Sequence, residues 1–220
     1  GIAAMIYEGA PANPEDLNQA YLSEIKNAGV NRLSLGIQSF DDAILKWLGR
    51  KHRTEQAQNC IRKALAVGLD KLSVDLIVGV PGECWRNIEK SIEWLTISQA
   101  VRHISIYLLT LEPQTSLWRM VGKGLKKAPI DDDQAVAYER IQNILLNKSG
   151  FCQYEISSFA KTGHESQHNR LYWAQGEYMG LGPGAHSMHL AGDGSVVRRH
   201  NKACLAEWLI DPAKARYEEE

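Results

Sequence analysis

Apolar residues follow two different periods in the first half of the chain, and the two periods alternate. Stretches with apolar residues three or four positions apart predict amphipathic helices, whereas alternating or continuous apolar runs predict strands. Helices are expected over residues 14–28, 41–48, 54–67 and 85–95. Strands are expected over residues 2–7, 30–37, 72–78 and 103–109. Strands and helices that alternate at this spacing predict βα units and a parallel sheet, and therefore an α/β fold.

The expected helices have start and stop residues at their ends. Asn13 and Thr54 are the expected N-caps of the first and third helices, and Asp41 opens the second. Gly29 and Gly68 follow the last apolar positions of the first and third helices, where glycine commonly ends a helix. The helix boundaries are therefore predicted from residues that can accept from the first backbone amides of a helix or can adopt the conformation that ends one.

The pattern changes after Pro113. A long helix is expected from the aspartates at 131–133 to Gly150, and a last helix around residues 203–210. The segment between them is rich in glycine, histidine and aromatic residues. We therefore expect two domains, over residues 1–112 and 113–220.

Composition and charge narrow the class of protein. The 220 residues are 44% hydrophobic with a formal net charge of -1, which is typical of a globular chain and does not favour a nucleic-acid partner. No apolar run reaches the roughly 18 residues that cross a bilayer, and the first residues lack the basic region of a signal peptide. The chain starts at Gly1, where a strand pattern is already in progress, so we expect a fragment of a longer protein.

The four cysteines indicate a reducing compartment. They stand at positions 60, 84, 152 and 204, too far apart for a disulfide framework or a CxxC metal site. We expect the cytoplasm, or the mitochondrial matrix in a eukaryote.

Four polar residues stand where the βα pattern expects apolar residues or loop ends. Asp75 lies inside the apolar strand 72–78, Gln38 and Glu8 follow strands, and Arg50 lies in a connection. Ligands bind at the carboxyl ends of the strands in such sheets, and a guanidinium can bind a carboxylate through two hydrogen bonds. The four residues suit a ligand with hydroxyl and carboxylate groups. The alternative is that Arg50 forms a structural salt bridge with Asp75 or Glu8.

Histidines cluster in the second half of the chain. Five of the seven lie at positions 164, 168, 186, 189 and 200, among tyrosines, tryptophan and glycines. Such a segment could hold a metal or a flat aromatic ligand such as a porphyrin. For His189 and His200, an ordinary hydrogen-bonded role is the simpler interpretation.

One histidine pair also matches the zinc-protease pattern H-E-x-x-H. His164 and His168 would share one face only if the motif were helical, and His186 or His189 could supply further ligands. Gly163 precedes the motif, and no apolar stripe accompanies it. A zinc hydrolase is therefore a remote alternative.

Four segments resemble a known family. They are GVNRLSLGIQSFDDAILKWLGR (29–50), LSVDLIVGVPGE (72–83), QYEISSFA (153–160) and HNRLYW followed by EYMGLGPGAHS (168–187). In this order they resemble the oxygen-independent coproporphyrinogen III oxidase-like family of radical S-adenosylmethionine (SAM) proteins, over nearly the whole chain. The HNxxYW element is similar to the branch regarded as heme chaperones.

The resemblance implies a fold and a set of ligands. The fold would be a partial (β/α)6 TIM-like radical SAM barrel over residues 1–112, containing about the last four βα units, with an α+β C-terminal extension over residues 113–220. Glu8, Gln38, Arg50 and Asp75 would contact SAM. His168 would bind heme, with Tyr172 or Trp173 against the macrocycle. The alternative is that HNxxYW only packs, with Asn169 capping a turn and Trp173 buried.

This sequence departs from the family in its cluster motif. Family members bind a [4Fe–4S] cluster through CxxxCxxC and have a Gly-rich SAM-binding strand soon after it, and neither occurs here. The cluster delivers the electron that cleaves SAM, so we expect no reductive cleavage by this chain. An incomplete barrel would also leave a hydrophobic strand edge, which makes a homodimer possible.

The resemblance implies a heme chaperone-type function. The parent protein would bind heme and pass it to acceptor apoproteins, with the cluster and SAM used for assembly or control. The alternative is an anaerobic coproporphyrinogen III oxidase that decarboxylates propionate side chains.

Overall fold

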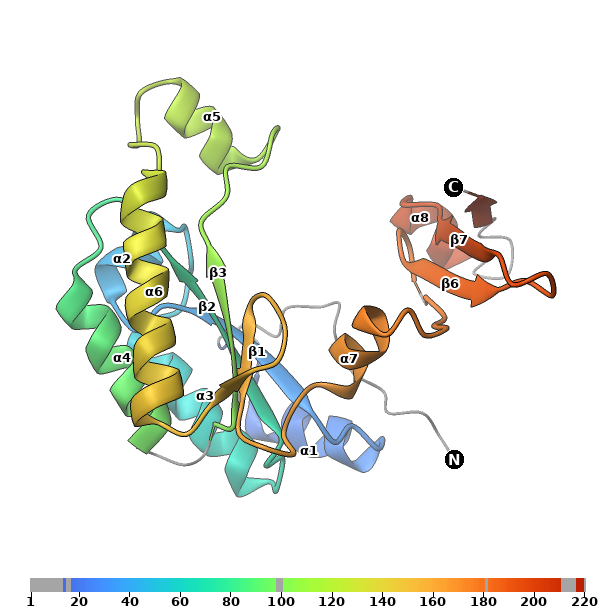
Figure 1. Cartoon of the computed structure of the whole chain (residues 1–220), viewed down its shortest axis with the longest axis horizontal. Coiled ribbons are helices and arrows are strands. Elements are labelled where there is room, and N and C mark those ends of the chain that lie inside the picture. Colours follow the sequence, from blue (N-terminus) through green and yellow to red (C-terminus); the bar gives the residue numbers. More distant parts are fainter. Residues whose placement is uncertain (1–13, 15–16, 98–100, 181, 211–216, 220) are drawn as a thin grey trace. The chain divides into compact units, whose positions relative to one another are not determined.

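The chain folds into two compact units. The computed structural model describes residues 14, 17–97, 101–180, 182–210 and 217–219 (Figure 1). By the packing of the backbone, the first unit is Gly1–Glu165 and the second is Ser166–Glu220. This division falls later than the boundary expected after residue 112, because the long helix and two short strands beyond that residue complete the sheet of the first unit.

The first unit is a five-stranded sheet with helices packed against it. Its elements are α1 (Gln19–Asn27), β1 (Leu33–Gln38), α2 (Asp42–Trp47), α3 (Thr54–Ala66), β2 (Leu72–Val78), α4 (Trp85–Ile97), β3 (His103–Leu108), α5 (Ser116–Gly122), α6 (Asp131–Lys148), β4 (Cys152–Gln153) and β5 (Ser158–Ala160). The strand order is β1-β2-β3-β5-β4. β1, β2 and β3 are parallel, whereas β5 runs antiparallel to β3, and β4 antiparallel to β5.

This architecture confirms the expected α/β fold with a parallel sheet. The predicted strand over residues 2–7 lies outside the described residues. The β4–β5 pair was not predicted. It extends the sheet with β5, which is reversed relative to β3, and then with β4, which again runs in the direction of β3.

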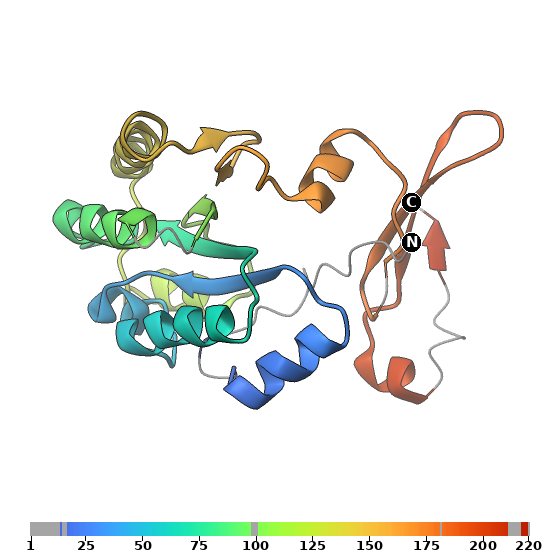
Figure 2. The same ribbon diagram turned by 90° about the horizontal axis from the view of Figure 1, so that it is seen from below.

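The core lies between one face of the sheet and the helices. Leu35, Val74 and Ile104, at the same level of β1, β2 and β3, are fully buried. α6 packs against β2, β3 and α4, and α1 packs against α3 (Figures 1 and 2). Burying the apolar helix faces against these strands is the main source of stability for such a layer.

Two of the three predicted caps differ from those observed. Asp41 caps α2 as expected, accepting from the Ala43 and Ile44 amides at 2.8 and 3.3 Å. α1 begins only at Gln19, because Asn18 accepts from the Tyr21 amide; the expected cap, Asn13, lies outside the described residues.

The third helix is stabilised at its N-terminus both locally and from the preceding helix. Thr54 is the first residue of α3, not its cap. Its amide and its hydroxyl both donate to Oδ1 of Asp42 at 2.8 Å. The N-cap is Arg53, whose amide donates to Oε1 of Gln56 at 2.8 Å. The contact from Asp42 is an addition that the local pattern around Thr54 could not show.

The second unit is a short helix followed by a three-stranded antiparallel sheet. Its elements are α7 (Gln167–Trp173), β6 (His186–Leu190), β7 (Val196–Asn201), α8 (Leu205–Ile210) and β8 (Tyr217–Glu219), with strand order β6-β7-β8. An isolated bridge joins Tyr178 to Met188 of β6, which ties the segment after α7 to the sheet. No helix among the described residues combines the length and apolarity needed to cross a membrane.

Candidate functional site

One face of the parallel sheet carries a layer of polar side chains. The layer consists of Ser34, Ser73, Asp75, His103, Ser105 and Ser158. In register, Ser73 pairs with both Ser34 and His103, which makes one row across three strands. Because side chains alternate along a strand, these residues point away from the apolar core.

Asp75 occupies the centre of this polar face. It lies in the second row, in register with Ser105 of β3, and is half-buried. The Ser34 hydroxyl donates to its carboxylate, with Oγ 3.1 Å from Oδ2 and 3.3 Å from Oδ1. A charge within a strand is costly unless it is paired or used, and here a hydroxyl from the neighbouring strand holds it. Asp75 therefore faces a polar environment, as a ligand-binding role requires.

A hydrogen-bonded chain crosses the first row of the same face. His103 Nδ1 lies 2.6 Å from Ser73 Oγ, and His103 Nε2 lies 2.7 Å from the hydroxyl of Tyr154. Burial, and then the charge of Arg32, lower the pKa of His103 to about 3, so the imidazole is neutral at pH 7. One ring nitrogen donates and the other accepts. Sequence reasoning missed this chain, although Ser73 and His103 are polar residues inside apolar strands.

Gln38 stands at the carboxyl end of β1 in a strained conformation. Its φ is 71°, in the left-handed region, and the β1–β2 register shifts between Leu35 and Gln38. A glutamine in this region costs free energy, and such residues cluster at functional sites. Gln38 is buried and pairs with Leu76, so it lies on the strand next to Asp75.

The other two predicted SAM contacts are less defined. Arg50 is half-buried and follows α2, where its amide donates to the Leu45 carbonyl at 2.9 Å after the turn at Gly49. Glu8 lies outside the described residues. The structure thus places Gln38 and Asp75 on adjacent strands and Arg50 in a connection.

The predicted heme residue lies on α7. Ser166 caps this helix, accepting from the Asn169 amide at 3.3 Å. His168 is half-buried, and its ring centroid lies 4.5 Å from that of Tyr172, nearly edge-on at 78°. Tyr172 in turn lies 4.3 Å from Tyr178. The three rings form one aromatic cluster in the second unit.

This geometry contradicts the packing alternative for HNxxYW. Ser166, not Asn169, caps the helix. Trp173 is 57% exposed and Tyr172 44% exposed. Exposed aromatic surface beside an imidazole fits a flat, largely apolar ligand that iron ligation would fix in place.

The zinc-hydrolase alternative is not supported. α7 begins at Gln167, so His164 is not on the helix that carries His168. The Nε2 atom of His164 lies 3.0 Å from the Arg102 guanidinium, and burial, then Arg102 and Arg32, lower its pKa. The shared helical face that H-E-x-x-H requires is absent.

The described residues also do not fit an iron–sulfur cluster. Cys60 is buried in α3, whereas Cys84, Cys152 and Cys204 are exposed on separate segments. Within the described part of the chain, no three His, Cys, Asp or Glu side chains converge as metal ligands would. We therefore assign no cluster chemistry to these residues.

Comparison with known proteins agrees with the fold. The family model "Radical SAM superfamily" matches residues 11–95. The solved structure of the Escherichia coli coproporphyrinogen III oxidase HemN, a radical SAM enzyme, matches with a TM-score of 0.70 at 18% identity, covering 94% of this chain and 49% of that one. Residues 11–95 therefore contain part of a radical SAM domain, in a chain whose fold matches that of HemN.

The relatives found by sequence point to a narrower group of proteins than the family model does. The chain is 39% identical to the heme chaperone HemW of Bacillus subtilis over 175 residues, which is 80% of this chain and 46% of the relative. It is 35% identical to the heme chaperone HemW of Lactococcus lactis over 210 residues, which is 95% of this chain and 54% of the relative. The chain is thus homologous to heme chaperones, and it spans about half of their length.

Proposed function

We propose that this chain binds heme at α7 and is part of a heme chaperone-type protein that delivers heme to acceptor apoproteins. The observation that carries the proposal is the cluster of His168, Tyr172 and Tyr178, with the exposed indole of Trp173 beside it. The relatives named as heme chaperones support the same assignment.

Three residues of α7 have a definite part in this proposal. Heme, when bound, would supply an iron that a nitrogen ligand can bind. The imidazole of His168 is that ligand, and its edge contact with Tyr172 limits the rotation of the ring. The exposed faces of Tyr172 and Trp173 cover part of the apolar macrocycle. Because the aromatic surface remains open to solvent, heme bound there can be passed on.

The test is a hemin titration followed by absorbance at the Soret band. We expect a saturable Soret shift for the chain as given, and loss of that shift in His168→Ala. His189→Ala is the matched control, since His189 is also half-buried in the second unit but lies on β6. A shift that persists in His168→Ala, or that fails equally in both variants, would contradict the assignment.

We infer a second ligand, SAM, at the polar face of the first unit. Gln38, Arg50, Asp75 and Glu8 are the proposed contacts. The support is that Ser34 holds the Asp75 carboxylate on the polar face and that the strained Gln38 ends the adjacent strand. Calorimetry with S-adenosylhomocysteine should show binding that is at least about tenfold weaker in Asp75→Asn. Asp70→Asn, at an exposed aspartate, should leave the affinity unchanged.

The chain should not perform the radical reaction itself. After reconstitution with iron and sulfide under a reductant, we expect no 5′-deoxyadenosine from SAM. We also expect no decarboxylation of coproporphyrinogen III. Formation of protoporphyrinogen would instead favour an oxidase, a function for which the likeness to HemN supports only the fold.

A further inference from the structure

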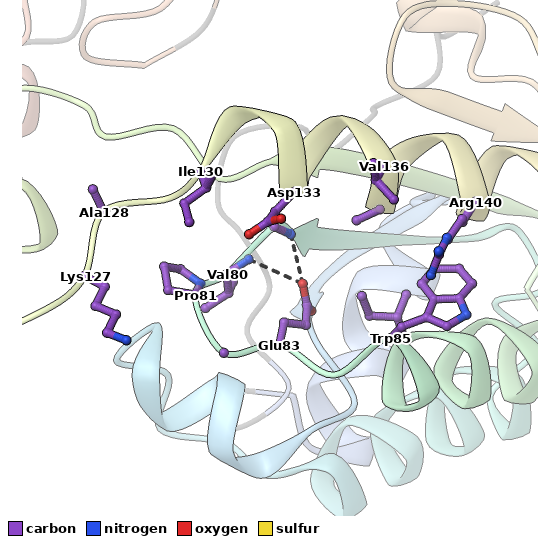
Figure 3. A pocket seen from close by; sticks show the side chains of 14 residues that line it. Val80, Pro81, Glu83, Trp85, Lys127, Ala128, Ile130, Asp133, Val136 and Arg140 are labelled. Atoms are coloured by element: carbon purple, nitrogen blue, oxygen red, sulfur yellow. Dashed lines mark hydrogen bonds between the residues drawn. The ribbon is translucent and has the colours of Figure 1, made fainter.

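A pocket lies in the first unit, beyond the C-terminal end of β2. It has a volume of about 440 Å³ and is formed by the β2–α4 turn, the start of α4, the loop before α6 and the first turns of α6 (Figure 3). The residues that shape it are Pro81, Glu83, Trp85, Asp133, Val136 and Arg140. Neither Asp75 nor Gln38 lines it, although Glu83 also lines a smaller neighbouring pocket that includes Gln38. This volume is within the range of pockets that bind small molecules.

Two carboxyl groups line this pocket from opposite walls. Glu83 comes from the β2–α4 turn and Asp133 from α6 (Figure 3). Oε2 of Glu83 accepts from the amides of Gly79 and Val80 at 2.8 and 3.3 Å, which fixes the carboxyl group in place. No hydrogen bond from the described residues reaches Oε1. Oε1 of this half-buried carboxyl group is therefore available to accept a hydrogen bond from a ligand.

The rest of the lining offers an aromatic face, apolar wall and two exposed cationic side chains. The guanidinium carbon of Arg140 lies 5.4 Å from the centroid of the Trp85 ring, so this aromatic face already accepts a cation. Ile88 and Val136 add apolar wall. Arg140 and Lys127 are exposed, so their flexible side chains can extend into water. The anchored carboxyl group, in contrast, cannot move away from the pocket.

We propose that this pocket binds a small organic cation, a primary amine or guanidinium on an apolar body, with Glu83 and Asp133 as its anionic partners. The apolar body packs against Trp85 and Val136. The proposal concerns a site of the first unit only, and it does not depend on heme or SAM binding.

Proton release should accompany binding. Burial is the main cause that raises the pKa of Glu83 to about 7, and Asp41, on the segment before α2, adds to the shift. From α6, Asp133 and Arg140 also line the pocket, and Lys127 lines it from the preceding loop. A bound cation favours the ionised form of Glu83, so binding expels its proton and strengthens as the pH rises through 7.

The experiment is calorimetric titration with 2-phenylethylamine at pH 6 and pH 8. The neutral 2-phenylethanol and the anionic phenylacetate are compared under the same conditions. We expect the amine to bind roughly tenfold more tightly at pH 8 than at pH 6, since a group with a pKa near 7 ionises over that interval. We expect neither other compound to bind as well as the amine.

Two variants with the same change of charge complete the test. Glu83→Gln keeps a carbonyl that can accept from Gly79 and Val80, so it should fold, and it should weaken amine binding about tenfold. Asp131 lies on the same first turn of α6 as Asp133 but outside the pocket lining, so Asp131→Asn should bind the amine like the unmodified chain. The proposal is overturned if a folded Glu83→Gln keeps its affinity, if phenylacetate binds equally well, or if the amine shows no saturable binding.

Discussion

Ser34 and Asp75 are joined diagonally across the β1–β2 pair. The backbone partner of Ser34 is Ser73, yet its hydroxyl reaches the carboxylate two residues further along β2. The charged residue that breaks the apolar pattern of β2 is thus held by a second polar residue from the adjacent strand. Both residues lie on the face of the sheet opposite the core, where a ligand can reach them.

Removing this hydroxyl should weaken the fold slightly. Ser34→Ala leaves the half-buried carboxylate of Asp75 without that donor, so we expect a loss of about 1 kcal/mol in the free energy of unfolding. Urea denaturation monitored by circular dichroism measures it. Ser23→Ala, on the more peripheral α1, should change the stability by no more than about 0.5 kcal/mol. Equal losses in the two variants would contradict a specific role for Ser34.

His103 should make the fold sensitive to acid. Its pKa is lowered from 6.5 to about 3 in the folded chain, chiefly by burial. The unfolded chain therefore binds more protons between these values, and stability should fall as the pH is lowered through this window, by up to about 1.4 kcal/mol per pH unit. Urea unfolding at pH 7.5, 6 and 5 measures the slope. His103→Asn should remove most of it, and an unchanged slope would count against the assignment.

Glu83 should make the stability depend on pH in the direction opposite to that of His103. Its pKa is raised from 4.5 to about 7, mainly by burial, so the folded chain binds the additional proton between these values. Its contribution to stability is complete below pH 4.5 and is lost as the pH rises through 7, by at most about 3 kcal/mol. Glu83→Gln should therefore be more stable than the unmodified chain at pH 8 but not at pH 5. Thermal unfolding at the two values measures the difference.

Gly79 and Gly82 offer a matched pair of glycines in the β2–α4 turn. Both have positive φ, +79° and +85°, so alanine at either position should cost about 1 kcal/mol of backbone strain. A Cβ at Gly79 would also collide with the side chain of Gln134, whose Nε2 donates to the Leu109 carbonyl at 2.8 Å. Gly79→Ala should thus destabilise the fold by about 2 kcal/mol more than Gly82→Ala, as measured by urea denaturation. Equal losses would show that Gln134 can move without cost.

Trp173 should matter for the ligand and not for the fold. Because the side chain is 57% exposed, Trp173→Ala should change the unfolding free energy by less than about 0.5 kcal/mol. It should weaken hemin binding several-fold by removing apolar contact area. Trp118→Ala, at a comparably exposed tryptophan of α5, should leave hemin binding unchanged. A large loss of stability in Trp173→Ala would indicate a packing role instead.

The sequence predicted those features that a local pattern of residues defines. β2 was predicted because its apolar run is nearly continuous, and Asp75 was identified because it interrupts that run. The segment that forms α7 was singled out as a candidate site by its histidine and its two aromatic residues. Its helical form was not predicted, because seven residues with an exposed aromatic surface show no apolar stripe.

Features that depend on distant partners could not be predicted. β4 and β5 contain two and three residues, too few to show a period. Tyr154 lies 51 positions from His103, so nothing near either residue indicates their hydrogen bond. The pocket beside Glu83 likewise depends on how α6 packs across the β2–α4 turn, which is a tertiary arrangement.

The reversed direction of β5 limits how the sheet can continue. A closed βα barrel requires every strand to have parallel neighbours on both sides, and β3 has an antiparallel one on the β5 side. The succession of βα units therefore stops at β3 along this edge. On the β5 side the loops connect antiparallel strands, whereas on the β1 side they follow parallel strands. A ligand on the polar face is therefore bordered by different kinds of loops on its two sides.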